Sequence, residues 1–67
     1  MLSTNMIKGR MMSRGLTQED LARTLGIARA TLCQKLNNVR PMSLVEAEKV
    51  ARCLDIDVGD FVKYFFA

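Results

Sequence analysis

Four side chains in the middle of the chain share one face of a predicted helix and include two groups that can form bidentate hydrogen bonds. They are Arg29, Ala30, Cys33 and Gln34. Helical spacing places them on one exposed side of a predicted helix over residues 28–37, opposite Leu32 and Leu36. An arginine can donate two hydrogen bonds to guanine, a glutamine can pair with adenine, and an alanine can contact the methyl group of thymine. Each bidentate pair contributes ~1–3 kcal/mol of discrimination against a wrong base.

A second helix and a turn must hold this helix out from the domain. Thr17 and Asp20 have the spacing of a capping box, so they predict a helix start at this point. Gly26 can adopt the left-handed conformation that ends a helix. The small side chain of Ala22 stands where the two helices must approach each other closely. The pair therefore predicts a rigid projecting helix of about the width that the major groove of DNA admits.

Three further helices are predicted around this pair. Apolar residues recur at helical spacing over residues 5–14 and again over residues 44–54. Ser43 and Glu46 form a second capping box in front of the latter segment. Asp57 is expected to cap the last helix. Strand-like alternation is absent throughout, so the sequence predicts an all-α fold with five helices and no sheet.

Composition restricts the class of protein. The chain has 67 residues, which predicts a single domain over residues 1–67. Of its residues, 49% are hydrophobic and 25% charged, which is typical of a folded domain. There is neither an apolar run of ~18 residues nor a signal-peptide pattern, so no membrane association is expected. Residues 1–40 carry seven basic and two acidic side chains, whereas residues 41–67 carry three and five. The front half is therefore the part expected to face a polyanion.

Catalytic and metal chemistry find no support in the sequence. Histidine is absent, and the two cysteines, Cys33 and Cys53, lack the spacing of a metal site. No nucleophile–base pair, phosphate-binding glycine loop or carboxylate constellation is recognisable. We expect no enzyme activity, no metal and no cofactor, with both thiols reduced inside the cell.

One stretch of the chain carries a family resemblance. The run Arg14-Gly15-Leu16-Thr17-Gln18-Glu19-Asp20-Leu21-Ala22, then Leu25-Gly26-Ile27 and Thr31-Leu32, closely resembles the Cro and cI-type helix-turn-helix family of phage repressors. The likeness extends from Ile7 to about Leu54. It implies a five-helix lambda-repressor-like domain, a Cro-like transcriptional repressor of double-stranded operator DNA, and a location in the cytoplasm of a bacterium or phage-infected host.

The resemblance also implies roles for individual residues. The exposed early positions of the third helix, which are Arg29, Ala30, Cys33 and Gln34 here, read bases in the family. The glutamine that opens the second helix anchors a phosphate, and Gln18 matches it. The loop after the third helix meets the DNA backbone, and the matching residues are Asn37, Asn38 and Arg40, with Lys35 nearby. Lys8, Arg10 and Arg23 are expected to be simply solvated, although Arg10 could approach a phosphate.

The sequence departs from the family pattern at two places. Many members cap the third helix with serine or threonine, where this chain has Ala28. The missing cap costs ~0.5–2 kcal/mol relative to a capped helix. Several members pair an arginine with a glutamate at the positions of Met11 and Leu36, where we expect an apolar contact instead.

The tail over residues 57–67 is rich in apolar residues and is a candidate interface. Its candidate interface residues are Val58, Phe61, Val62, Tyr64, Phe65 and Phe66. Phe61 and Phe65 are expected in the core, and Tyr64 and Phe66 near the surface. Dimers of the family pair through this region, so a homodimer on DNA is one hypothesis. The tail could equally close the core of a monomer. An alternative function is that of a modulator or antirepressor that binds a partner repressor protein.

Overall fold

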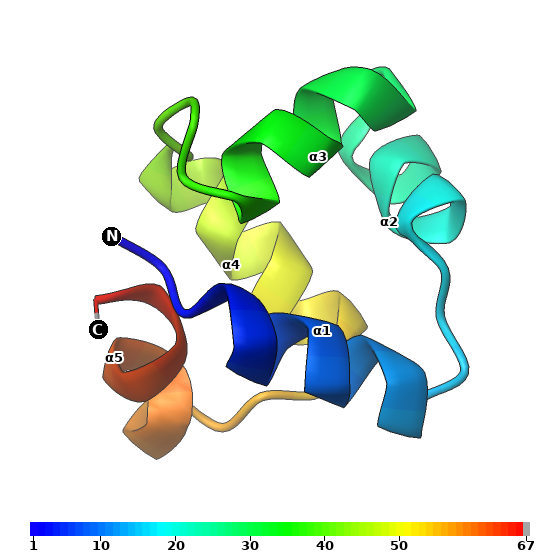
Figure 1. The fold of residues 1–67 in the computed structure, drawn as a ribbon. Coiled ribbons are helices and arrows are strands. Elements are labelled where there is room, and N and C mark those ends of the chain that lie inside the picture. Colours follow the sequence, from blue (N-terminus) through cyan, green and yellow to red (C-terminus); the bar gives the residue numbers. More distant parts are fainter. Residues whose placement is uncertain (67) are drawn as a thin grey trace.

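Five helices joined by short turns make up residues 1–66, the part of the chain that this computed structural model describes (Figure 1). Residue 67, the last of the predicted tail, lies outside it. The helices are α1 (Thr4–Ser13), α2 (Gln18–Leu25), α3 (Arg29–Leu36), α4 (Leu44–Cys53) and α5 (Val58–Phe65). No strand occurs within residues 1–66. The predicted all-α fold with five helices is confirmed.

Side-chain caps define the starts of two helices. The Thr17 hydroxyl accepts a hydrogen bond from the Asp20 backbone N–H at 3.1 Å, and the Asp20 carboxylate accepts one from the Thr17 N–H at 3.0 Å. Ser43 and Glu46 make the same reciprocal pair at the start of α4. Both predicted capping boxes are therefore confirmed. Asp57 occupies the N-cap position of α5, but its side chain accepts no capping hydrogen bond.

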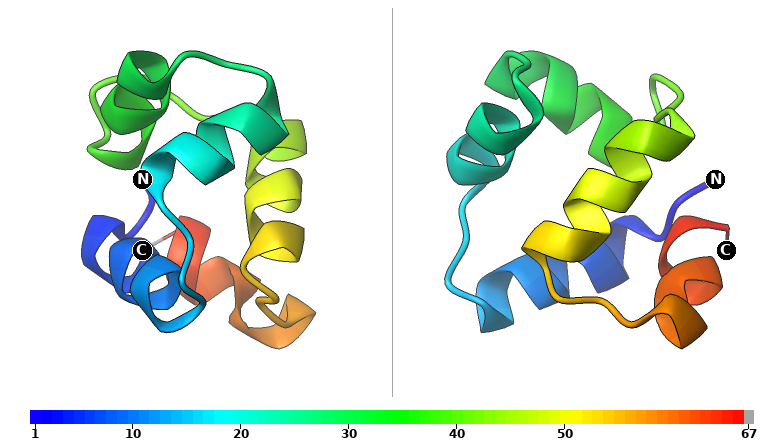
Figure 2. Two further views of the ribbon diagram at one scale, coloured as in Figure 1. Left: turned by 90° about the vertical axis from the view of Figure 1, so that its right-hand side faces the viewer. Right: turned by 180° about the vertical axis from the view of Figure 1, so that it is seen from behind.

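The turn between α2 and α3 depends on a left-handed residue. Gly26 has φ of 71°, a conformation that costs a residue with a Cβ atom more than it costs glycine. From this turn α3 runs back across α2, and α2 also packs against α4 (Figure 2). In Figure 1, α3 lies along one edge of the molecule, so that one of its sides has no helix over it.

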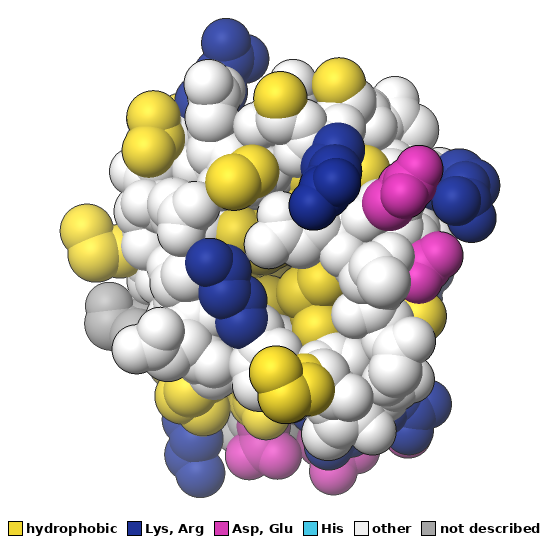
Figure 3. All heavy atoms as spheres, turned by 45° about the vertical axis from the view of Figure 1, so that its right-hand side comes forward, with side chains coloured by type: hydrophobic (Ala, Val, Ile, Leu, Met, Phe, Trp, Pro, Cys, Tyr) yellow, Lys and Arg dark blue, Asp and Glu magenta, His cyan; other side chains and the backbone are white. Residues whose placement is uncertain are grey.

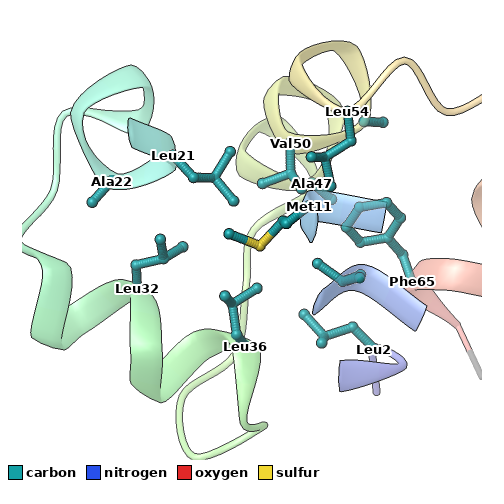
Figure 4. Close-up of a cluster of buried hydrophobic side chains, with 12 residues drawn as sticks. Leu2, Met11, Leu21, Ala22, Leu32, Leu36, Ala47, Val50, Leu54 and Phe65 are labelled. Atoms are coloured by element: carbon teal, nitrogen blue, oxygen red, sulfur yellow. The ribbon is translucent and has the colours of Figure 1, made fainter. Parts of the chain in front are cut away.

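The core is a single apolar cluster to which every helix contributes (Figure 4). Its fully buried side chains are Ile7, Leu21, Leu32, Leu36, Val50 and Leu54. Met11 and Leu36 both belong to the cluster. An apolar environment thus occupies the place where several family members have an ion pair, as the sequence predicted.

The first residues of the chain lie beside the end of α5 (Figures 1 and 2). The backbone N–H of Ser3 donates to the carbonyl oxygen of Tyr64 at 2.7 Å. Leu2 and Phe65 are both buried in the core near this contact. Within the described residues, no helix combines the length and the apolar composition that crossing a bilayer requires.

A matched pair of substitutions on α4 tests this core. Val50 is fully buried, whereas 61% of Val45 on the same helix is exposed. Val50→Ala should lower the free energy of unfolding by about 2 kcal/mol, because each buried CH₂ contributes ~0.8 kcal/mol and a cavity is left behind. Val45→Ala should change it by less than about 0.5 kcal/mol. Urea denaturation followed by circular dichroism measures both; equal losses would contradict the described core.

Candidate nucleic-acid interface

The outer face of α3 presents the side chains that the sequence singled out. Arg29, Ala30 and Gln34 are exposed, and Cys33 is half-buried. The opposite face of the same helix carries Leu32 and Leu36, which are completely buried. Neither Arg29 nor Gln34 packs inside the domain, so their guanidinium and amide groups can reach a partner outside it.

Cys33 is the most constrained member of this face. Its Sγ atom accepts a weak contact from Nδ2 of Asn37 at 3.4 Å, one turn further along the chain. Both cysteines are free thiols, and the described residues contain no group of three side chains suited to hold a metal ion. Cys33 thus differs from its neighbours in being partly covered by the loop that follows the helix.

The start of α3 lacks a side-chain cap. Ala28 occupies the N-cap position with extended backbone and contributes no capping hydrogen bond. The first N–H groups of any α-helix have no partner within the helix. The start of α3 thus keeps its positive end uncompensated, as the sequence departure predicted.

Gln18 is the first residue of α2 and borders a depression between this helix and α1. The depression, which we call the α1–α2 hollow, is lined by Lys8, Met11, Met12, Leu16 and Gln18 and has a volume of about 310 Å³. Figure 3 shows a hollow with apolar side chains at its floor and basic side chains beside it. Gln18 is half-buried and belongs to the lining of this hollow, so its side chain is not fully extended into solvent.

The loop after α3 is held in place by Asn38. This residue has φ of 60°, a left-handed conformation that asparagine tolerates better than most residues. Its side-chain amide accepts from the N–H of Leu2 and donates to the carbonyl of Leu2, both at 3.0 Å. The backbone N–H of Asn38 donates to Lys35. Asn38 is therefore committed to positioning the loop, and its donors are already used within the domain.

Arg40 belongs to the same loop, but its side chain is free to meet a partner outside the domain. Its side chain is exposed, and within residues 1–66 no hydrogen bond or ion pair involves its guanidinium. Asn37 is also exposed. The loop thus offers a cation and an amide to the solvent beside the end of α3.

Lys35 points away from this surface. Its ammonium group donates to the carboxylate of Glu46 on α4, and only 15% of the Lys35 side chain is exposed. The hydrogen bond from Lys35 and a second from the Ser43 backbone hold the pKa of Glu46 below its usual range. The structure thus gives Lys35 a role in joining α3 to α4, which the sequence reasoning missed.

Arg10 also makes a contact that the sequence analysis did not foresee. Its guanidinium donates to the carbonyl oxygens of Leu54 and Asp55, both at 2.8 Å. These carbonyls follow the end of α4, where a cation is favourable. Arg10 lies three residues after the buried Ile7, so helical spacing places both on the same side of α1. This spacing could have indicated from the sequence that Arg10 faces the rest of the domain. The expectation that Arg10 is simply solvated was wrong.

Comparison with protein families identifies this arrangement. Residues 6–67 match the family model of the Cro/C1-type HTH DNA-binding domain. The chain belongs to this family. Neither the curated proteins nor the solved structures gave a match. The family match confirms the resemblance inferred from the sequence and makes α2, the Gly26 turn and α3 the helix-turn-helix of a DNA-binding domain.

The tail of this Cro/C1-type domain divides into inward and outward side chains. Phe65 is buried in the core, and Phe61 stacks on it with ring centroids 4.7 Å apart. Tyr64 is half-buried. Phe65 is therefore removed from the candidate interface, because the packing of α5 against α1 covers its ring.

The outward side of the tail adjoins α4. Val58, Val62 and Phe66 are exposed, with 92% of Val58 accessible. A groove of about 480 Å³, which we call the α4–α5 groove, separates the two helices. Val58 and Val62 line it from α5, while Leu44, Glu48 and Arg52 line it from α4. Of the candidate interface residues, Val58, Phe61 and Val62 line this groove, and the lining residues from α4 were not among those candidates.

The ion pair between α3 and α4 predicts a dependence of stability on pH. Because the pKa of Glu46 is lower in the folded state, the pair stabilises the domain above the usual pKa of about 4.3, and this contribution is lost as the pH falls through the lower, folded-state pKa. Glu46→Gln keeps an acceptor for Ser43 but removes the charge. It should destabilise the domain at neutral pH and reduce the loss of stability on acidification.

Thermal unfolding at a series of pH values between about 6 and 3 measures this effect, since that window spans the carboxylate titration. Glu19→Gln is the control, because Glu19 is exposed, takes part in none of the ion pairs of the described residues and lies outside the α4–α5 groove. The control should retain the acid sensitivity of the wild type. If both variants retained it equally, the pair would not contribute as described.

Proposed function

We propose that this Cro/C1-type domain is a sequence-specific transcriptional repressor that places α3 in the major groove of operator DNA. The observation that carries the proposal is the two-sided character of α3: Leu32 and Leu36 fix one side in the core, while Arg29 and Gln34 extend from the other into solvent. Arginine and glutamine are side chains that can read guanine and adenine by bidentate hydrogen bonds.

The proposed contacts divide into base reading and backbone positioning. Arg29 and Gln34 read bases, with Ala30 and Cys33 contributing apolar contacts between them. Gln18, Asn37 and Arg40 bind phosphates on either side of the helix. Lys35 and Asn38 are not among the proposed phosphate contacts, because Lys35 is mostly buried in its pair with Glu46 and the side-chain amide of Asn38 is bonded to Leu2. Phosphate contacts fix the orientation of such a domain, and base contacts supply its specificity.

A second copy of the chain completes the proposal. The longest dimension of the domain is 29 Å, whereas successive major-groove half-sites are ~34 Å apart, so one domain covers one half-site. The α4–α5 groove is the surface proposed for dimerisation. Glu48 and Arg52 also line it, and a two-fold axis that passes between these two positions would set Glu48 of one copy opposite Arg52 of the other.

Substitutions in the two classes of contact should have different effects. Arg29→Ala or Gln34→Ala should each cost ~1–3 kcal/mol on the preferred sequence and relax selectivity at one base position. Arg40→Ala should weaken binding to all duplexes alike and reduce the slope of log K against log salt concentration by about 0.9. Gel shifts with an operator selected from a random duplex pool, and with a scrambled duplex, measure both effects.

The wild type supplies the reference for this comparison. It should enrich a defined sequence from the random pool and bind it more tightly than the scrambled duplex. Failure to enrich any sequence would refute sequence-specific recognition. Equal effects of all three substitutions on the selected and scrambled duplexes would refute the division between reading and positioning.

The proposed dimer gives a separate prediction. Val58→Asp should shift the monomer–dimer equilibrium toward monomer, because it sets a charge in the α4–α5 groove of each copy. Sedimentation equilibrium, with and without the selected operator, measures the change. Val45→Asp is the control, since Val45 is also an exposed apolar residue but does not line the groove and lies outside the proposed DNA contacts.

A wild-type protein that stays monomeric even on the operator would refute dimerisation. Loss of binding to a co-expressed repressor protein on Val58→Asp substitution, together with failure to bind DNA, would instead support the alternative function of a modulator or antirepressor.

A further inference from the structure

Lys8 occupies a position on α1 that brings its ammonium group to the helix-turn-helix. Its Nζ atom lies 3.5 Å from Oδ1 of Asn37, which is 29 positions further along the chain, at the end of α3. Lys8 also lines the α1–α2 hollow, and Gln18 stands on the rim of the same hollow. A residue that the sequence indicated to be merely solvated therefore adjoins two proposed phosphate contacts, one at each side of the helix-turn-helix.

The surroundings of Lys8 favour an anion. The residues that line the α1–α2 hollow include no acidic side chain. Among the described residues, the ion pairs involve Arg14, Arg23, Lys35 and Lys63 but not Lys8. Within residues 1–66, the side chain of Lys8 bonds to the neutral amide of Asn37 alone. An exposed ammonium group that is not paired with a carboxylate is available to an anionic partner outside the domain.

The apolar side chains of the hollow suit the sugars of a nucleic-acid backbone. The apolar lining residues of the hollow are Met11, which is buried, Leu16, which is half-buried, and Met12, which is exposed. A DNA strand alternates anionic phosphates with sugars whose carbon atoms pack well on apolar side chains. A flexible methionine adapts to such irregular shapes. Basic groups beside an apolar floor, as Figure 3 shows, match that alternation.

We propose that Lys8 binds a DNA phosphate and that the α1–α2 hollow receives the stretch of backbone that runs between the contacts of Gln18 and Asn37. This inference rests on the proposed binding of duplex DNA and adds α1 to its contact surface. Lys8 then has two roles: it neutralises a phosphate directly, and through Asn37 it holds the end of the reading helix in its position.

The salt dependence of binding distinguishes this contact from a general effect of charge. Lys8→Gln and Lys49→Gln each lower the net charge by one, but Lys49 lies exposed on α4, outside the proposed contact surface. Lys8→Gln should reduce the slope of log K against log salt concentration by about 0.9. Between 50 and 200 mM salt its affinity should therefore fall by a factor about threefold smaller than that of the wild type. Lys49→Gln should keep the wild-type slope.

Two further measurements keep the test decisive. Lys8→Arg should restore most of the slope, because an arginine at this site also binds phosphate. Selection from a random duplex pool should return the same sequence for Lys8→Gln as for the wild type, since a phosphate contact carries no base preference. Circular dichroism melting of the variants verifies that the fold is retained.

The outcomes separate this inference from the function on which it rests. A wild-type protein that binds a selected duplex, together with a Lys8→Gln variant of unchanged slope, would overturn the role of Lys8 alone. The same change of slope in Lys8→Gln and Lys49→Gln would also overturn it, because the effect would then follow net charge. A wild-type protein that binds no duplex would overturn the proposed function and this inference with it.

Discussion

The burial of one side of α3 is the constraint on which the rest of the structure depends. A helix of eight residues is too short to be stable alone in water, so α3 exists only because Leu32 and Leu36 are packed against the core. That requirement fixes the rotation of the helix about its axis. The side chains that could read DNA are consequently those on the remaining side, and their direction is set by packing rather than by any ligand.

The elements around α3 fix the position of its exposed side relative to the rest of the domain. Gly26 sets the angle at which the helix leaves α2, and the Lys35–Glu46 pair joins its end to α4. The proposed phosphate contacts come from the same part of the structure: Gln18 begins α2, and Asn37 and Arg40 follow the end of α3. The proposed DNA recognition therefore requires little rearrangement of the protein, because α3 and its neighbours are already ordered by the packing of the core.

Sequence patterns predicted most of the fold but only part of the candidate site. Helical periodicity and the two capping boxes are local signals, and a left-handed glycine is strongly tied to its residue type, so helix number and the helix-turn-helix were accessible. The contacts of Lys35, Asn38 and Arg10 join residues that are 11, 36 and 44 positions apart. No local pattern specifies which distant partner a long polar side chain meets, so the sequence could place these residues on helices or loops but not assign their bonds.

The contacts of the first residues have a consequence for the loop after α3. Ser3 bonds to Tyr64, and Leu2 bonds to Asn38, so the first residues tie the last helix to the loop after α3. Opening of the first residues would remove the hydrogen bonds between Leu2 and Asn38, so the loop after α3 depends for its position on residues at the start of the chain.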